Sequence, residues 1–179
     1  MTRLSLLLVL GIFLACGNGS PEGGATAGSA APPAGESGPA AAEKTASAPT
    51  VTVGQASFTV ELAVTQAQWS QGLSRRPTMA AGTGMLFVFE QESHQAFWMK
   101  DMRFPLDLVW IDAQCTVVDI SSDVPPPEPG QPLNDLPTYA PSAPVVYVLE
   151  INAGEARAAG LRRGDHLGFA GTLAGRFGC

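Results

Sequence analysis

The stretch from residue 84 to residue 111 constrains the fold most, because it breaks into three short apolar runs separated by polar residues. Runs this short, rich in Phe, Val and Trp, are typical of β-strands rather than helices. They predict strands at residues 85–90, 96–99 and 106–112. Because the stretch holds much of the chain's aromatic content, we expect it to supply both the core and the main functional site.

Alternating apolar and polar residues predict a half-buried strand at residues 58–64, paired with residues 51–53 across a turn at Gly54. Residues 145–151 are apolar on both faces apart from Glu150, which predicts a central strand. Further strands are predicted at residues 116–120 and 166–169.

Thr65 and Gln68 match a capping box, so a short helix should begin there and run to about Leu73. A second helix is predicted at residues 153–159, closed by a glycine. Residues 121–144 contain eight prolines and no periodicity, which predicts a long loop. About seven short strands and two short helices indicate an α+β fold, mainly an antiparallel β barrel or sandwich.

The amino terminus predicts export. Arg3 precedes an apolar run at residues 4–14, which is too short for a membrane span of about 20 residues and predicts a signal peptide at residues 1–15. Residues 13–16 resemble a bacterial lipoprotein signal box, which implies lipidation of Cys16. The alternative is an ordinary secretory signal with an incidental cysteine. By resemblance to lipoprotein sorting, Gly17 implies the outer membrane, with the protein facing the periplasm.

The composition then divides the chain. Residues 16–49 hold the cysteine and a Gly, Ala, Pro and Ser linker that cannot bury enough apolar surface to fold, so we expect it to be disordered. Residues 50–170 form the predicted β-rich domain, and residues 171–179 a flexible tail. Residues 50–179 carry 8 Lys and Arg against 13 Asp and Glu, so the net charge of about −5 disfavours nucleic-acid binding.

Several motifs carry a family resemblance: GLSRRPTM, GMLFVF, FWMKDMRFPLDLVWID and YVLEINAGEARAAGLRRGDHL, in this order. Over roughly residues 57–169 the chain resembles the bacterial and archaeal domain of unknown function 192 (DUF192) family. It departs from the family pattern at Gln68, Ser74, Phe104 and the pair Asp101-Met102. The resemblance implies a compact β-rich fold and brings no established reaction, substrate or cofactor.

Charges that interrupt apolar runs are the candidate site residues, because a buried carboxylate is costly unless it is paired or hydrogen-bonded. Asp107 and Glu150 interrupt two predicted strands, and the nearest candidate counter-charges are Arg76, Lys100 and Arg103. One hypothesis gathers Asp107, Glu150, Lys100 and Arg76 with Trp98 in a polar cleft that binds a small ligand. The alternative is an internal network of ion pairs and hydrogen bonds that locks strand ends and turns.

Trp98 has two interpretations: it stacks on a sugar ring at an exposed edge, or it fills the core. Asp107 and Glu150 could also act as acid and base in glycan cleavage if their carboxyl groups lie roughly 5 to 9.5 Å apart. The two histidines, His94 and His166, lie in no nucleophile or metal motif. Enzyme activity is therefore the weaker prediction.

Copper binding is a further alternative, because thioether and imidazole groups suit Cu(I). The candidate ligands would be His94, Met99 and Met102, with Met85 nearby, but core packing explains the strand methionines more simply. No metal or cofactor is predicted. Cys115 and Cys179 could form a disulfide in an envelope compartment, with free thiols or pairing between chains as alternatives.

The sequence thus predicts a cell-envelope lipoprotein, held to the membrane by its lipid. Its single domain is expected to bind an envelope glycan or an envelope protein. The rival prediction is a small hydrolase acting on cell-wall or capsular saccharide.

Overall fold

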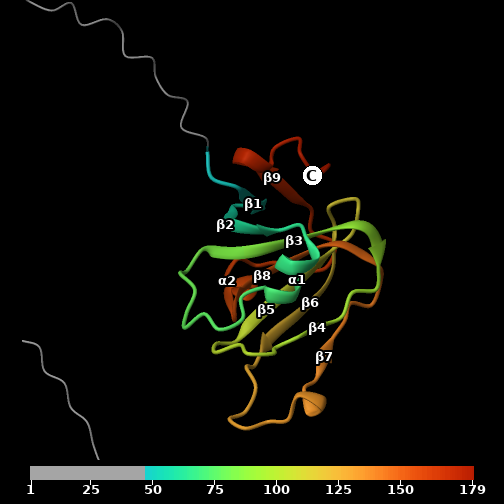
Figure 1. Cartoon of the computed structure of the whole chain (residues 1–179). Helices are drawn as coiled ribbons and strands as arrows, with labels where there is room; N and C mark the ends of the chain where they lie inside the picture. The colour runs from blue at the N-terminus through green and yellow to red at the C-terminus, as the bar shows by residue number, and fades with distance from the viewer. Residues whose placement is uncertain (1–46) are drawn as a thin grey trace, which may run out of the picture. The chain divides into compact units, whose positions relative to one another are not determined.

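In the computed structural model, which describes residues 47–179, seven strands form one curled sheet in the order β6-β5-β8-β3-β2-β1-β9 (Figure 1). The sheet strands are β1 (Thr50–Val53), β2 (Ala56–Ala63), β3 (Thr83–Ser93), β5 (Leu106–Ile111), β6 (Val117–Val124), β8 (Val145–Asn152) and β9 (Leu167–Ala170). A backbone bridge between Thr116 and His166 joins the starts of the two edge strands, β6 and β9. The sheet therefore closes partly on itself, as a half-barrel.

Short elements complete the fold. They are α1 (Gln66–Gln71), α2 (Glu155–Ala158), the two 3-10 turns η1 (Leu133–Asp135) and η2 (Gly171–Leu173), and the two-stranded pair β4 (Phe97–Trp98) with β7 (Thr138–Tyr139). The sheet is mainly antiparallel, and β2 with β3 is a parallel pair. The predicted α+β class, with about seven short strands and two short helices, is confirmed.

Local sequence signals explain the first elements. β1 and β2 form the expected antiparallel hairpin, in which Gly54 adopts a positive φ of 55° at the turn. The capping box forms as predicted, because Thr65 Oγ1 accepts from the Gln68 amide while Gln68 Oε1 accepts from the Thr65 amide. The helix α1 begins at the residue after Thr65.

The apolar run of β8 lies between β5 and β3, so it is an interior strand as expected. All six residues of β5 are buried. Strands covered on both faces give nearly continuous apolar sequences, and this explains why β5 and β8 show no simple alternation.

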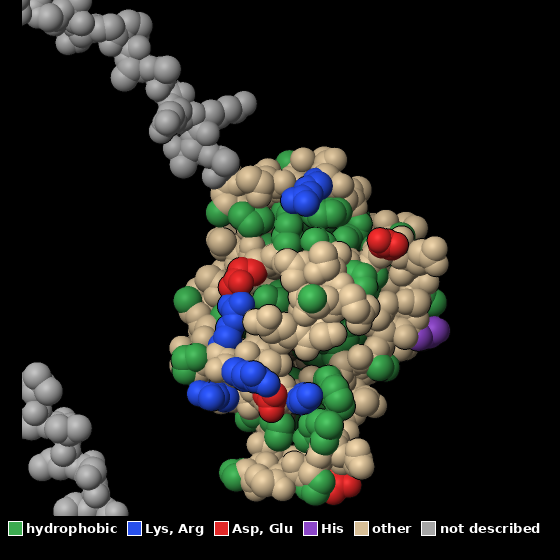
Figure 2. Space-filling view, in the orientation of Figure 1, with side chains coloured by type: hydrophobic (Ala, Val, Ile, Leu, Met, Phe, Trp, Pro, Cys, Tyr) green, Lys and Arg blue, Asp and Glu red, His purple; other side chains and the backbone are tan. Residues whose placement is uncertain are grey.

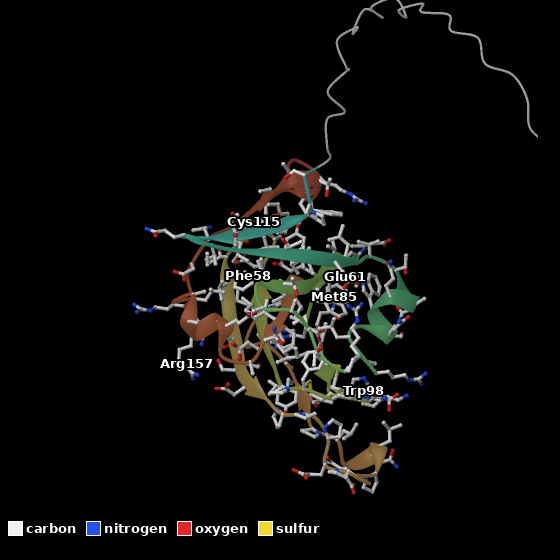
Figure 3. The ribbon with its side chains drawn as sticks, turned by 90° about the vertical axis from the view of Figure 1, so that its left-hand side faces the viewer. Phe58, Glu61, Met85, Trp98, Cys115 and Arg157 are labelled. Atoms are coloured by element: carbon white, nitrogen blue, oxygen red, sulfur yellow. A yellow bond between two sulfur atoms is a disulfide. The ribbon has the colours of Figure 1, made fainter. Side chains whose placement is uncertain are left out.

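The sheet separates two apolar clusters, because successive side chains of a strand point to opposite faces. One cluster, the α2-face core, contains Val109, Ile111, Leu149 and Ile151 and is joined by Leu173 from η2. The other, the α1-face core, contains Leu108, Trp110, Val148, Met85 and Phe87. Figure 3 shows Glu61, Met85 and Trp98 on the same side as α1, with Arg157 of α2 on the opposite side.

The carboxyl-terminal segment differs from the predicted flexible tail. Leu173 is fully buried, Phe177 packs against the α2-face core, and the Tyr147 hydroxyl donates to the Phe177 carbonyl. Cys115 and Cys179 form a disulfide with Cα atoms 5.6 Å apart. A Gly-rich composition concealed this docking, because a few apolar side chains and one covalent bond are enough to fix a short segment.

Two further predictions need correction. The strand β6 extends to Val124, so residues 121–124, placed in the long loop, continue the sheet as the partner of β5. The rest of the predicted loop contains η1 and β7. The strand predicted at residues 96–99 is shorter in the structure. It covers Phe97–Trp98, which pair with the two residues of β7.

Residues 1–46 lie outside the described part of the chain. They include the predicted signal peptide, Cys16 and most of the predicted linker. Between residues 47 and 179, no helix has the length and hydrophobicity that crossing a bilayer requires.

Candidate functional site

A cleft of about 330 Å³ lies on the α1 face of the sheet. One wall is α1 with the turn that follows it, the floor comes from β3 and β8, and the other wall is the segment around β4. The lining includes five aromatic residues and one carboxyl group: Trp69, Phe87, Phe89, Phe97, Trp98 and Glu150. Most of the other lining residues are polar, so the cleft combines aromatic side chains with hydrogen-bonding groups, which together can position a small ligand.

The aromatic wall is ordered by edge-to-face packing. The Phe97 ring lies 4.9 Å from the Phe87 ring and 5.4 Å from the Trp110 ring, both as T-shaped pairs. On the other side of the cleft the Trp69 indole donates to the Ala63 carbonyl at 2.9 Å. These contacts hold the aromatic side chains of both walls in fixed orientations.

Trp98 is exposed although it follows the inward-facing Phe97. Neighbouring residues of a strand point in opposite directions, so inward packing of Phe97 directs Trp98 outward. Its side chain is 48% exposed, and Lys100 Nζ lies 5.8 Å from its ring centroid. Core packing, one of the two interpretations of Trp98, is therefore excluded in this structure.

Glu150 lies at the floor of the cleft and is only 7% exposed. Its Oε2 atom is buried and has no hydrogen-bond partner among residues 47–179. Burial raises the pKa of Glu150 to about 8, against a smaller opposing effect of the Arg76 charge. At neutral pH the carboxyl group is therefore mainly protonated, and it can donate a hydrogen bond as well as accept one.

Arg76 does not neutralise Glu150, because Glu61 of β2 binds its guanidinium. The two bonds of this pair are Nη1 to Oε1 at 2.5 Å and Nη2 to Oε2 at 2.8 Å. The hydrogen bonds lower the pKa of Glu61 and raise the pKa of Arg76. In register, Glu61 pairs with Met85, and Met85 pairs with Glu150, so all three lie in one row across the sheet.

Asp107 lies apart from this cleft. In the register of β5 with β8, Asp107 pairs with Ile151 and Leu108 pairs with Glu150, so the two carboxyl side chains point to opposite faces. Asp107 is fully buried, and its oxygens accept from the Asp123 amide at 2.8 Å and the Ala156 amide at 2.9 Å. The structure therefore gives Asp107 the predicted alternative role, because its hydrogen bonds fix the irregular end of β6 and the start of α2.

The hypothesis of one shared cleft thus needs correction. The structure brings Trp98, Lys100 and Glu150 to one cleft. Arg76 lies near Glu150, but its guanidinium is bound to Glu61. Asp107 lies on the opposite face of the sheet and is not part of the cleft. The pairing of Asp107 with Glu150 as acid and base fails for the same reason.

Two glycines of the sequence motifs are required by close packing around β3. A Cβ atom on Gly84 would come within 2.4 Å of the Glu150 carbonyl oxygen, so only glycine lets β3 approach β8 at this point. Gly72 ends α1 with a positive φ of 48°, and a Cβ there would lie 3.3 Å from the Phe87 ring.

A second hollow, of about 600 Å³, adjoins the cleft. Its charged lining consists of Arg75, Lys100, Asp101 and Arg103, and its apolar wall comes from Pro127, Leu133 and Leu136. Lys100 and Met102 line both hollows. Figure 2 shows basic side chains gathered around an acidic one just above the lobe that contains η1.

The candidate copper ligands are explained by packing. Met85 and Met99 are buried in the α1-face core, Met102 packs against it, and His94 lies on an exposed segment. Within residues 47–179, no group of three or more His, Cys, Asp or Glu side chains is placed to hold a metal ion.

A family model described as an uncharacterized ACR, the DUF192 family, matches residues 49–169. The chain belongs to the DUF192 family. The match includes every residue that lines the cleft and the second hollow. A search of curated proteins finds no match.

Two crystal structures resemble the DUF192 domain of this chain. A protein from Sinorhizobium meliloti 1021, provisionally described as a transcription regulator, is 33% identical, with a TM-score of 0.60, over 70% of this chain and 97% of its own. A protein of unknown function from Novosphingobium aromaticivorans DSM 12444 is 29% identical, with a TM-score of 0.59, over 67% of this chain and 82% of its own. Both therefore support the fold and leave the function open.

Sequence reasoning missed Trp69, Phe97 and Glu61 as parts of the site. Alternation in β2 could have placed Glu61 opposite the core residues Phe58 and Val60, but the partner of Glu61 depends on the loop that carries Arg76. The signal for Phe97 was its position beside Trp98, since one of two adjacent strand residues must face inward.

Proposed function

We propose that this DUF192 protein is an envelope lipoprotein that binds a glycan in the cleft on the α1 face of its sheet. The observation that carries the proposal is the exposed Trp98 at the mouth of an aromatic cleft whose floor is the buried carboxyl group of Glu150. The half-exposed indole of Trp98 lines the cleft, with Lys100 Nζ 5.8 Å from its ring centroid, so it offers a ligand both an aromatic surface and a polar edge.

The chemistry of the cleft suits a sugar ring. A pyranose presents C–H groups on one face, which can stack on Trp98, and hydroxyl groups at its edge. A protonated Glu150, which lines the floor of the cleft, can offer those hydroxyl groups both a donor and an acceptor. Polar groups of this kind set specificity beside the aromatic side chains of the cleft.

The cellular setting follows from the amino-terminal sequence. Cleavage before Cys16 and its lipidation would anchor the chain, since several buried acyl chains give stable membrane attachment. The Gly- and Pro-rich linker would then present the domain to envelope glycans. The proposed location of the protein is the periplasmic side of the outer membrane.

The binding proposal is tested by calorimetric titration of the detergent-purified full chain with neutral and acidic envelope oligosaccharides. At least one should bind, and Trp98→Ala should lower its affinity by about tenfold, in line with the loss of one stacked aromatic contact. Val64→Ala is the matched control, because Val64 is an exposed apolar residue that does not line the cleft. If no oligosaccharide binds, or if Trp98→Ala changes nothing, the proposal is wrong.

Anchoring is tested separately. Cys16→Ser should move the protein from the membrane fraction to the soluble fraction and remove the mass of the acyl chains. An unchanged mass and fractionation would contradict lipidation.

Hydrolysis is a second candidate, because a carboxyl group with a raised pKa is suited to general acid catalysis. However, Glu150 is the one carboxyl group in the cleft lining among the described residues, and most glycosidases need two. Binding is therefore preferred. Release of reducing ends from a bound oligosaccharide, lost in Glu150→Gln, would favour the hydrolase instead.

A further inference from the structure

We propose that the hollow lined by Arg75, Lys100 and Arg103 binds the carboxylate or phosphate group of an acidic glycan, next to the sugar ring stacked on Trp98. We call this hollow the basic subsite. The inference rests on the proposed glycan binding and adds the charge of the ligand.

The charge distribution is the first support. Residues 50–179 have 8 basic and 13 acidic side chains, yet the basic subsite has three basic side chains and one acidic one, Asp101. A local excess of positive charge on an acidic domain raises the local concentration of anions and favours their binding.

The basic groups are also available to a ligand. Arg75 has one ion-pair partner, Asp101, at 3.5 Å, and both side chains are largely exposed, so water screens this pair strongly. Neither Lys100 nor Arg103 forms an ion pair with any residue between 47 and 179. Arg76, by contrast, already has a bidentate partner in Glu61.

The backbone that carries these cations is fixed. The Arg75 amide donates to the Asp101 carbonyl at 2.8 Å, and Ser74 Oγ donates to the Lys100 carbonyl at 3.0 Å. These hydrogen bonds join two chain segments that lie about 25 residues apart in sequence. The positively charged side chains of both segments therefore extend from a backbone that is held in place.

The subsite continues the aromatic cleft. Lys100 lines both hollows, and its Nζ lies 5.8 Å from the Trp98 ring centroid. A sugar ring stacked on Trp98 would thus place its neighbouring acidic group beside Lys100 and Arg103. The far wall of the basic subsite includes Leu133, which is 47% exposed. This wall would contact the apolar face of the acidic sugar.

The test uses pairs of oligosaccharides that differ only in charge: an oligogalacturonate and a hyaluronan fragment, each compared with its carboxyl-reduced form. Calorimetric titration of the full chain should show that the acidic member of at least one pair binds about tenfold more tightly than its reduced form at low salt. High salt should reduce this difference, because exposed charges are screened.

Four variants identify the basic subsite. The double substitution Lys100→Gln with Arg103→Gln should abolish the preference for the acidic oligosaccharide over its reduced form. Arg103→Gln alone, at a residue that lines the second hollow and not the cleft, should weaken this preference and leave binding of the reduced form unchanged. Asp101→Asn should raise the affinity for the acidic form, since it removes the single carboxylate of the hollow and since Asn tolerates the positive φ of 58° there. Arg162→Gln with Arg163→Gln, at two exposed arginines outside both hollows, is the charge-matched control for the double substitution.

The outcomes separate this inference from the proposed function. Equal binding of the acidic and reduced forms, with loss of both in Trp98→Ala, would overturn the basic subsite and leave glycan binding intact. Absence of binding to every member of both pairs would overturn the inference. Binding to duplex DNA or to anionic lipid vesicles that Lys100→Gln with Arg103→Gln abolishes, without preference for acidic glycan, would assign the hollow to another ligand and also overturn it.

Discussion

The buried carboxyl groups on the two faces of the sheet differ in their hydrogen bonds. On the α2 face, Asp107 accepts hydrogen bonds from two backbone amides, and η2 and the disulfide-linked tail pack against the adjoining core. On the α1 face, Glu150 leaves Oε2 without a partner among residues 47–179 and lies under an open aromatic cleft. Two residues in neighbouring positions of adjacent strands thus have different surroundings: Asp107 is hydrogen-bonded within the fold, and Glu150 is the group that we propose contacts a ligand.

The largest expected effect comes from opening the α2 face. Cys179→Ser breaks the bond to Cys115 and should lower the free energy of unfolding by about 4 kcal/mol in the chain-entropy model, for a sequence separation of 64 residues. Urea denaturation of the purified protein measures the change, with Arg176→Gln as a control in the same tail. An unchanged unfolding midpoint would show that packing of the tail, rather than the bond, closes this face.

Asp107→Asn should have the next largest effect, about 3 kcal/mol. The amide group of asparagine would point a donor at a backbone amide and leave a buried group unsatisfied. Urea denaturation at neutral pH checks the value, and Asp135→Asn, at an exposed position of η1, shows the cost of removing an acidic charge elsewhere. Wild-type stability of Asp107→Asn, together with lost ligand binding, would reverse the roles given to the two faces.

Glu150→Gln should change the pH dependence of stability more than it changes the stability at low pH. The folded state keeps a proton up to about pH 8, whereas the unfolded state releases it near pH 4.5, so Glu150 makes stability fall as pH rises through this window. The slope from this one group is about 1.4 kcal/mol per pH unit at most. Below about pH 4.5 and above about pH 8 its contribution stays constant.

The measurement is the difference in free energy of unfolding between wild type and Glu150→Gln at several pH values. Wild type should lose stability relative to the variant between about pH 5 and pH 8. A difference that does not change with pH would mean that Glu150 is ionised in the folded state, as an ordinary surface carboxylate is.

Trp98→Ala should have the smallest effect on stability, below about 1 kcal/mol, because half of the side chain is already exposed. Thermal unfolding of the variant, with Phe97→Ala as the inward-facing neighbour for comparison, checks this. Phe97→Ala should cost several times more, since its ring packs against Phe87 and Trp110. Equal losses from the two substitutions would show that the cleft is part of the core.

The contrast between the two faces also shows how far sequence reasoning reaches. Local signals were sufficient for the β1–β2 hairpin, the capping box at Thr65 and the interior strand β8, because each depends on residues that are close in sequence. The pairing partners of strands depend on contacts across long connections, and the parallel pairing of β2 with β3 left no local signature.

The candidate site depended on register in the same way. Sequence identified Asp107 and Glu150 as unusual, but an offset of one residue in pairing places them on opposite faces. It identified Arg76 as a cation near the site but could not supply its partner Glu61. Trp98 and Lys100 were identified together because they are neighbours in a single short segment.

The central claim is that Glu150 is a buried, protonated group at the floor of a ligand cleft. Carbon-13 NMR of the Glu150 side-chain carboxyl carbon against pH, with and without a bound oligosaccharide, tests it most directly. If Glu150 is protonated at the floor of the cleft, its carboxyl carbon should titrate with a midpoint near pH 8. The midpoint should rise when the saccharide excludes more water from the cleft. A midpoint near pH 4.5 that the saccharide does not move would contradict it.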